Sequence, residues 1–263
     1  MDELSIQTLL DTPFVTLRDV ACRGSCRHRS PEECASATHM VFPYRGVYVR
    51  HVGRSEAVAE ANQVLFFNRG EGYQISHPVA GGDACLSLRL ADPARAELAP
   101  RKPNELRRRI AAEAQTLLLQ LRQRLVNQSI GVLEAESLTL ALARSALGGR
   151  ARRGTAGNRK LVERAKLVLA SDPARRWTLS DVAAEVGVSP VYLTQLFKQV
   201  EGVPLYRYQL RLRLARALEL LGRADDISAL SLDLGFSSHS HFTASFRRAY
   251  GCTPVQFRKG MRS

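Results

Sequence analysis

The chain has 263 residues, enough for two compact domains and a connector, and its hydrophobic and charged fractions of 45% and 24% are those of an ordinary globular protein. Its net charge of +13 favours a polyanionic partner, because lysines and arginines placed on phosphates release counterions; a solvated basic surface is the alternative. No apolar run reaches the roughly 18 residues of a membrane-spanning helix, and the acidic start MDELSIQTLLDTP lacks the positive region of a secretory signal. From these features we expect neither a membrane-spanning nor a secreted protein, and we expect a cytoplasmic location.

The segment CRGSCRHRSPEEC (residues 22–34) holds three of the five cysteines. An odd cysteine count in a cytoplasmic chain indicates thiols or metal ligands rather than structural disulfides. The predicted ligands of zinc or another thiophilic metal are Cys22, Cys26, Cys34 and Cys85, with His28 and His39 as alternatives. The spacing is looser than a Cys-x-x-Cys knuckle, and the flanking arginines favour the thiolate form. Redox-reactive thiols and unliganded cysteines therefore stay open as alternatives, and Cys252 is interpreted as a small buried residue.

Residues 1–102 are predicted to form a β-rich domain. Segments such as GVYVRHV, NQVLFFN and CLSLRL are short and rich in β-branched or aromatic residues, and turn formers separate them at residues 68–72 and 78–83. His77, which begins HPVAGGD, is interpreted as part of a strand end and turn. The spacing predicts a small sandwich or barrel, and the whole chain is expected to be an α+β two-domain protein.

Residues 103–148 are predicted to form two amphipathic connector helices. In the first, Leu106, Ile110, Leu117, Leu121 and Leu125 recur at helical spacing; the second, LEAESLTLALARSAL, follows a break at residues 127–131. These helices either pack back onto the β-domain or pair with a second copy, and we expect a homodimer. A flexible basic linker is predicted at residues 149–158.

Residues 159–263 contain one short motif twice. The first copy is DVAAEVGVSPVYLTQLFK (181–198) and the second is ISALSLDLGFSSHSHFTASFR (227–247). The motifs lie in the more basic part of the chain, since residues 156–263 hold 17 Lys and Arg against 9 Asp and Glu. Between them, PLYRYQLRLRLARALELL is predicted to be a long helix that holds the two copies at a fixed separation.

Each copy is predicted to be a helix-turn-helix. Gly187 or Gly235 adopts the left-handed conformation after the first helix, and a serine, Ser189 in one copy and Ser237 or Ser238 in the other, caps the second. Leucine and phenylalanine side chains bury one face of the second helix, which leaves the opposite face for the major groove. Two such helices about 34 Å apart would enter successive major grooves; an all-helical domain that binds no nucleic acid is the alternative.

These motifs resemble the DNA-binding domain of the AraC/XylS (arabinose-regulator) family of bacterial transcription factors. The resemblance covers residues 159–263 and rests on TLSDVAAEVGVSPVYLTQLFKQVEGVPLYRYQLRLRLARALELL followed by LGFSSHSHFTASFRRAYGCTPVQFRK. It implies that the chain regulates transcription by binding double-stranded promoter DNA, with RNA polymerase as a further candidate partner. It also implies that the β-rich domain is a cupin-like sensor.

By the same resemblance, the DNA-binding residues are Val191, Thr194, Gln195, Lys198, His239, Ser240, Thr243, Ala244, Arg247 and Arg248. Lys198, Arg247 and Arg248 are expected at phosphates and the others at base edges. Ala244 departs from the family, which often has a long polar or basic residue there. The second recognition helix is therefore expected to contribute more positioning and less base readout.

No catalytic activity is expected. The histidines show no closely spaced His-x-His pair with a following glutamate, which a catalytic iron site in a β-domain of this kind would need, and no phosphate-binding loop or Ser/His/Asp signature is present. The alternatives to a metal- or thiol-responsive regulator are a regulator that senses a small organic ligand, and a DNA-repair protein that accepts alkyl groups on an activated cysteine.

Overall fold

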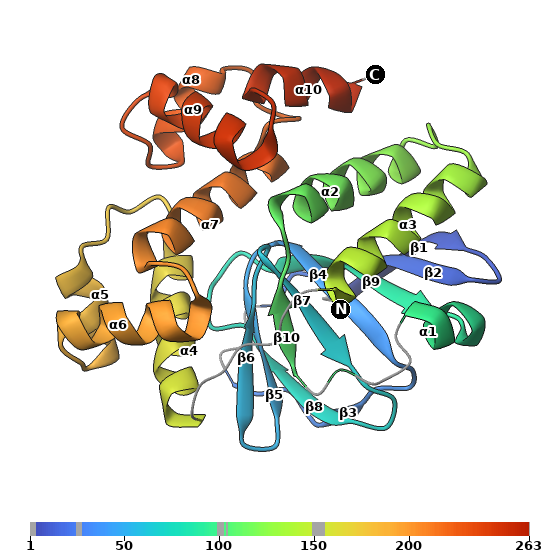
Figure 1. Cartoon of the computed structure of the whole chain (residues 1–263), viewed down its shortest axis with the longest axis horizontal. Coiled ribbons are helices and arrows are strands. Elements are labelled where there is room, and N and C mark those ends of the chain that lie inside the picture. The colour runs from blue at the N-terminus through green and yellow to red at the C-terminus, as the bar shows by residue number, and fades with distance from the viewer. Residues whose placement is uncertain (1–3, 25–27, 99–102, 104, 149–155, 263) are drawn as a thin grey trace. The chain divides into compact units, whose positions relative to one another are not determined.

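The computed structural model describes residues 4–24, 28–98, 103, 105–148 and 156–262. The chain divides into two compact units, residues 1–150 and residues 151–263, and each is described by itself. The first unit is β-rich and carries a few helices, and the second is helical (Figure 1). Among the described residues, no helix is both long and apolar enough to cross a membrane.

The N-terminal unit contains two antiparallel sheets. The strands are β1 (Leu4–Asp11), β2 (Val15–Cys22), β3 (Glu33–Cys34), β4 (His39–Arg45), β5 (Tyr48–Val52), β6 (Ser55–Ala59), β7 (Gln63–Phe67), β8 (Gly72–Ser76), β9 (Asp83–Leu90) and β10 (Arg107–Arg109). One sheet has the order β1-β2-β9-β4-β7-β10 and the other the order β3-β8-β5-β6. The β-rich domain expected from the sequence is confirmed, and of the two predicted forms, a small sandwich or a barrel, the sandwich is observed.

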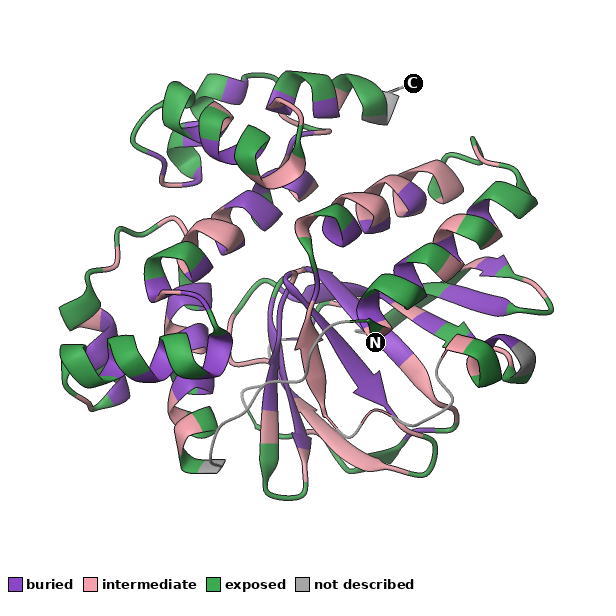
Figure 2. Ribbon diagram, viewed as in Figure 1, coloured by how far each residue is buried: buried purple, intermediate pink, exposed green. Residues whose placement is uncertain are grey.

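Side chains alternate between two cores along the central strands, as the two-residue period of a strand requires. Phe42, Phe66 and Leu86 point to a core shared with the helices that follow the sheet. Their sequence neighbours, including Leu65 and Cys85, point to a second core between the two sheets. Strand β7 is therefore buried along its whole length (Figure 2).

The connector differs from the sequence prediction at its start. Residues 107–109 form β10, which pairs with β7, and the first connector helix begins only at Ala112. Pairing with β7 makes these residues a strand. The Arg108 guanidinium also donates hydrogen bonds to the last carbonyls of the second connector helix, at Ala146 (3.1 Å) and Leu147 (2.5 Å). Leu106 and Ile110 thus belong to the edge of the sheet.

The helices of this unit are α1 (Asp92–Leu98), α2 (Ala112–Val126) and α3 (Val132–Leu147). Helices α2 and α3 pack on the six-stranded sheet through a buried set that includes Leu118, Leu121 and Leu142. Of the two arrangements that the sequence left open, packing within the chain is thus observed. Val132 and Leu133 remain exposed at the start of α3.

The C-terminal unit is helical throughout. Its helices are α4 (Ala156–Ser171), α5 (Leu179–Val186), α6 (Pro190–Glu201), α7 (Leu205–Leu220), α8 (Ile227–Asp233), α9 (His239–Tyr250) and α10 (Pro254–Arg262). Most of the predicted linker lies outside the described residues, and α4 starts inside its last three residues. Helix α7 is buried on more than one side, with Tyr208, Leu212, Leu214, Ala217 and Leu218 all shielded from solvent.

A buried charge cluster of Lys166, Glu163 and Glu201, here named the Lys166 cluster, ties α4 to α6. The Lys166 Nζ lies 3.5 Å from a Glu163 carboxylate oxygen and 3.9 Å from one of Glu201. The lysine is fully buried and also lies 5.7 Å from the centre of the Tyr208 ring. A buried cation is tolerated only beside such counter-charges, so the cluster fixes the position of α6.

Candidate functional site

The turn of the first helix-turn-helix motif has the predicted chemistry. Thr178 and Asp181 form a reciprocal capping box at the start of α5, and Gly187 ends that helix with φ 78°. No atom lies within 4 Å of the position that a Cβ of Gly187 would take, so its backbone conformation alone explains the glycine.

The first recognition helix, α6, starts as predicted and buries the predicted face. The Ser189 hydroxyl accepts a hydrogen bond from the Tyr192 amide, and Pro190 follows at the first helical position. Leu193, Leu196 and Phe197 are buried on its inner face. The predicted DNA-contacting residues of this helix are all exposed: Val191, Thr194, Gln195 and Lys198.

Thr194 presents a restricted set of groups on this face. Its hydroxyl donates to the carbonyl of Pro190 at 2.9 Å, one turn back in the helix. The hydroxyl proton is therefore occupied, which leaves the methyl group and the oxygen lone pairs for a base edge. Gln195 has no such internal bond among those of the described residues, and its amide offers both donors and an acceptor.

The second motif repeats this arrangement with different residues. Gly235 has φ 80°, and Ser238 rather than Ser237 is the N-cap of α9, accepting from the His241 amide at 3.1 Å. Phe242 and Phe246 are fully buried. Ser231 is buried and its hydroxyl donates a hydrogen bond to the Ser228 carbonyl at 2.7 Å.

A shallow groove runs along the exposed face of α9. It is lined by His239, Ser240, Thr243, Ala244, Arg247, Arg248 and Thr253. All six residues predicted for this helix are therefore brought together. The Thr243 hydroxyl oxygen is shielded from solvent, so that residue offers its methyl group to the groove.

Thr253 is a groove residue that the sequence reasoning missed. It precedes Pro254, the first residue of α10, and exchanges hydrogen bonds with Gln256 in the manner of a helix cap. A threonine followed by proline is a helix-start signal, and helix starts present amides to phosphates. That signal could have identified the position.

Arg213 of α7 joins the two motifs. Its guanidinium donates to the carbonyls of Pro173, Ala174 and Arg175 before the first motif and to the carbonyl of Gly235 in the second, at 2.7–3.2 Å. A Cβ at Gly235 would lie 2.1 Å from the Ala174 carbonyl oxygen, so the two segments meet backbone to backbone. Trp177 lies partly buried beside this junction, with the Arg175 guanidinium 3.9 Å from its ring centre.

The predicted metal ligands do not converge as a set. Cys34 is exposed on β3, Cys85 is buried on β9, and Cys26 lies outside the described residues. Burial raises the pKa of the Cys85 thiol, with further increases from nearby acidic groups, so this thiol stays protonated. Cys252 is only partly buried, contrary to expectation.

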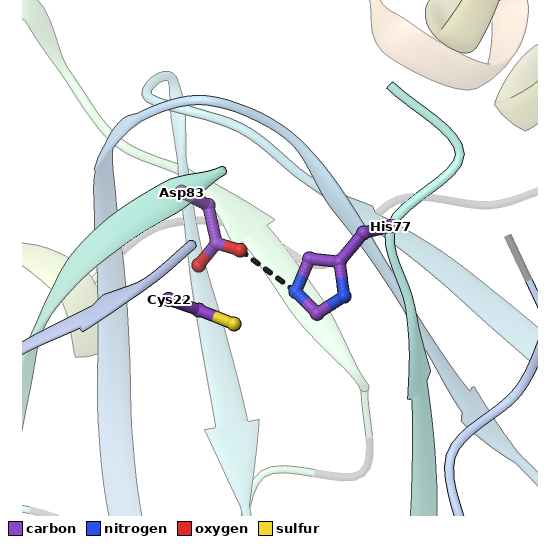
Figure 3. Close-up of side chains that lie close together, drawn as sticks. All are labelled: Cys22, His77 and Asp83. Carbon is purple, nitrogen blue, oxygen red and sulfur yellow. Dashed lines mark ion pairs between the residues drawn. The ribbon is translucent and has the colours of Figure 1, made fainter. Parts of the chain in front are cut away.

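The alternative histidine ligands also lie elsewhere. His28 is exposed. The His39 ring stacks on Phe67 with 4.8 Å between ring centres, and burial lowers its pKa. Instead, Cys22 groups with His77 and Asp83, and within the described ranges this is the one group of three or more potential ligands whose donor atoms all lie within 4.8 Å of one another (Figure 3).

The sequence of the C-terminal unit matches known regulators. A helix-turn-helix domain family matches residues 182–260. Over 100 residues the chain is 37% identical to the HTH-type transcriptional regulator ExsA of Pseudomonas aeruginosa, covering 38% of this chain and 36% of ExsA. It is 35% identical over 103 residues to the virulence regulon transcriptional activator VirF of Yersinia enterocolitica, covering 39% and 38%. The chain thus spans well under half the length of these relatives.

The chain is also similar to solved structures. An AraC-type DNA-binding domain protein from Chromobacterium violaceum is 33% identical, covering 41% of this chain and 96% of that one, with a TM-score of 0.39. ToxT from Vibrio cholerae aligns over 99% of both chains with 12% identity and a TM-score of 0.39.

Proposed function

Because the chain belongs, through its C-terminal domain, to the AraC/XylS family of helix-turn-helix regulators, we propose that it binds promoter DNA sequence-specifically and regulates transcription. The observation that carries the proposal is the pair of recognition helices, α6 and α9, each with a buried apolar face and an exposed polar one. The excess of basic residues in the same unit supplies the attraction to phosphates.

The two recognition helices present different chemical groups to DNA. Helix α6 offers the free amide of Gln195, which can form paired hydrogen bonds to adenine, beside the apolar Val191 for a thymine methyl. Helix α9 offers mainly small groups in its groove and the basic pair Arg247 and Arg248 at its end. We therefore assign base readout chiefly to α6, and positioning on the phosphate backbone chiefly to α9.

A DNA-binding series tests this division. A binding site is first selected from random DNA with the unmodified protein, and the affinity of each variant is then measured for that site, for its single-base-pair variants and at several salt concentrations. Gln195→Ala should lose about 1–3 kcal/mol of binding free energy on the selected site. It should also relax the base preference at one or two positions of that site. Arg247→Ala should weaken binding to all DNA sequences by the same factor. It should also reduce the slope of log affinity against log salt concentration by about 1.

The control is Arg216→Ala, which removes an exposed arginine of α7 that lies on neither recognition helix. It should leave both the affinity pattern and the salt slope close to those of the parent. A uniform loss on every sequence for Gln195→Ala would contradict its role in base readout. Failure of the parent chain to select any site would refute the proposed function itself.

The N-terminal sandwich is proposed to be the input domain, of the cupin-like type that accompanies this DNA-binding domain in the family. Its half-buried Cys22 supports a metal or thiol signal, since the side chain lies among other potential ligands rather than in an apolar core. We further propose a cytoplasmic homodimer that acts with RNA polymerase. The exposed Val132 and Leu133 on α3 support self-association.

A further inference from the structure

A cluster of three different donor side chains lies between the two sheets of the N-terminal domain. Cys22 ends β2 and Asp83 begins β9, and the two residues are directly opposed in the antiparallel ladder. Residues so paired project to the same face of a sheet. His77 follows β8, a strand of the other sheet, so the cluster spans the sandwich (Figure 3).

Two glycines lie at close backbone contacts beside the cluster. Gly82 has φ 68°, and a Cβ there would lie 2.4 Å from the Cys22 carbonyl oxygen. Gly46, also at φ 68°, would bring a Cβ to 2.0 Å from the Gly82 carbonyl oxygen. Only glycine fits at these two contacts, where the backbone segments beside Cys22 and Asp83 approach each other closely.

The donor atoms themselves are arranged for a shared cation. The Asp83 side chain is buried, and its Oδ2 accepts no hydrogen bond of good geometry from the described residues, although His77 Nε2 lies 2.8 Å away. The Gly24 amide donates to the Cys22 sulfur at 3.3 Å. Such outer hydrogen bonds orient a ligand sulfur and stabilise its thiolate form.

The geometry fits a metal better than a nucleophile. A Cys–His–Asp relay would use both imidazole nitrogens, one for the thiol and one for the carboxylate. Figure 3 instead shows the Cys22 sulfur and the Asp83 carboxylate on the same side of the His77 ring. One nitrogen therefore faces both groups, as it would when all three bind one ion.

We propose that Cys22, His77 and Asp83 form a mononuclear zinc-type site with an exchangeable fourth ligand. Sulfur, imidazole and carboxylate donors together suit Zn²⁺, and tetrahedral bonds of about 2.0–2.3 Å put donor atoms about 3.3–3.8 Å apart. The observed separations, up to 4.8 Å, reach these values with sub-ångström to ångström shifts. Binding releases the thiol proton of Cys22 to solvent.

This site differs from a four-cysteine site in how many coordination positions the protein fills. Three protein ligands leave one coordination position for water or a small anionic molecule, whereas a four-thiolate site is closed. The site deepens the proposed function, on which its role as a signal input rests, while metal binding itself does not depend on DNA binding.

A metal titration of the reduced 263-residue chain under anaerobic conditions tests the site. Zn²⁺ is followed by competition with a chromophoric chelator, and Co²⁺ by its absorption spectrum. One metal per chain is expected, with a thiolate-to-cobalt charge-transfer band and the intense visible bands of a four-coordinate ion. A chain that binds neither ion would overturn the proposal.

Two site variants and one matched control complete the test. Cys22→Ser should abolish the charge-transfer band, and the near-isosteric Asp83→Asn should lower zinc affinity by about 100-fold or more, since even outer-shell partners account for about 10–100-fold. Cys34→Ser, at the exposed cysteine of β3, should leave both unchanged. The ligand set would be refuted if Cys34→Ser and Cys22→Ser lost zinc affinity equally. It would also be refuted if Cys22→Ser retained the thiolate-to-cobalt charge-transfer band.

DNA binding is measured in parallel, with and without a chelator. Because the recognition helices lie in the other domain, loss of metal with intact DNA binding overturns the metal site alone. Loss of DNA binding by a chain that holds its metal overturns only the proposed function.

Discussion

Replacing Arg213 by alanine should uncouple the two helix-turn-helix motifs. The guanidinium donates four hydrogen bonds to backbone carbonyls, three of them before the first motif and one at Gly235 in the second. Removal of the side chain leaves these carbonyls without their donor at the place where the two motifs meet.

The expected loss follows from the number and exposure of these bonds. A hydrogen bond contributes about 1 kcal/mol net, and about 1.5–3 kcal/mol when one group is charged. Arg213 is half-buried, and water can reach some of the freed carbonyls, so the lower value applies. Four bonds at about 1 kcal/mol, less partial hydration, give a loss of about 3 kcal/mol in the free energy of unfolding of the C-terminal domain.

The single tryptophan, Trp177, lies in this domain and provides the assay. Urea unfolding followed by its fluorescence reports the C-terminal domain alone. The matched control is Arg216→Ala on the same helix, whose exposed ion pair with Glu219 should contribute about 0.5 kcal/mol or less. A value for Arg213→Ala within about 0.5 kcal/mol of this control would refute the reasoning and show that water replaces the guanidinium.

Two further predictions concern the stability of the same domain. Gly187→Ala should cost about 1–2 kcal/mol for the left-handed backbone alone, whereas Gly235→Ala adds a clash with the Ala174 carbonyl and should cost about 1–3 kcal/mol more; equal losses by urea unfolding would contradict the backbone contact. Lys166→Met removes the buried ammonium that lies beside the Glu163 and Glu201 carboxylates and should lower the free energy of unfolding by about 3–5 kcal/mol. Adding Glu201→Gln to that variant should restore part of the loss, and a double-mutant cycle that shows no coupling would exclude a direct interaction.

The sequence was sufficient where structure depends on neighbouring residues. Gly187, Ser189 and Pro190 determine the first turn through bonds within four residues of each other, and all three behave as predicted. Phe242 and Phe246 are buried for the same reason, since helical periodicity assigns them to one face. The exposed recognition faces followed directly from these assignments.

The sequence was insufficient where contacts between segments far apart in the chain determine the structure. Residues 107–109 fit a helical pattern, yet pairing with β7 makes them a strand. Cys22 meets Asp83 because of the register between β2 and β9, and no spacing in the sequence reveals a register. His77 was interpreted as part of a strand end and turn. Its two partners lie on other strands, Cys22 at the end of β2 and Asp83 at the start of β9, so the sequence around His77 does not reveal them. The ligand set proposed from cysteine spacing therefore missed two of the three residues that converge.

Helix α7 sets a limit on how the C-terminal domain can be divided. It packs against the first motif, where Phe197 meets Tyr208 with 5.3 Å between ring centres, and it holds the second through Arg213. A fragment that carries one motif and this helix would expose the apolar face that the missing motif normally covers. We therefore expect the two motifs to unfold together, and we expect a half-domain to aggregate rather than to act as a minimal DNA-binding module.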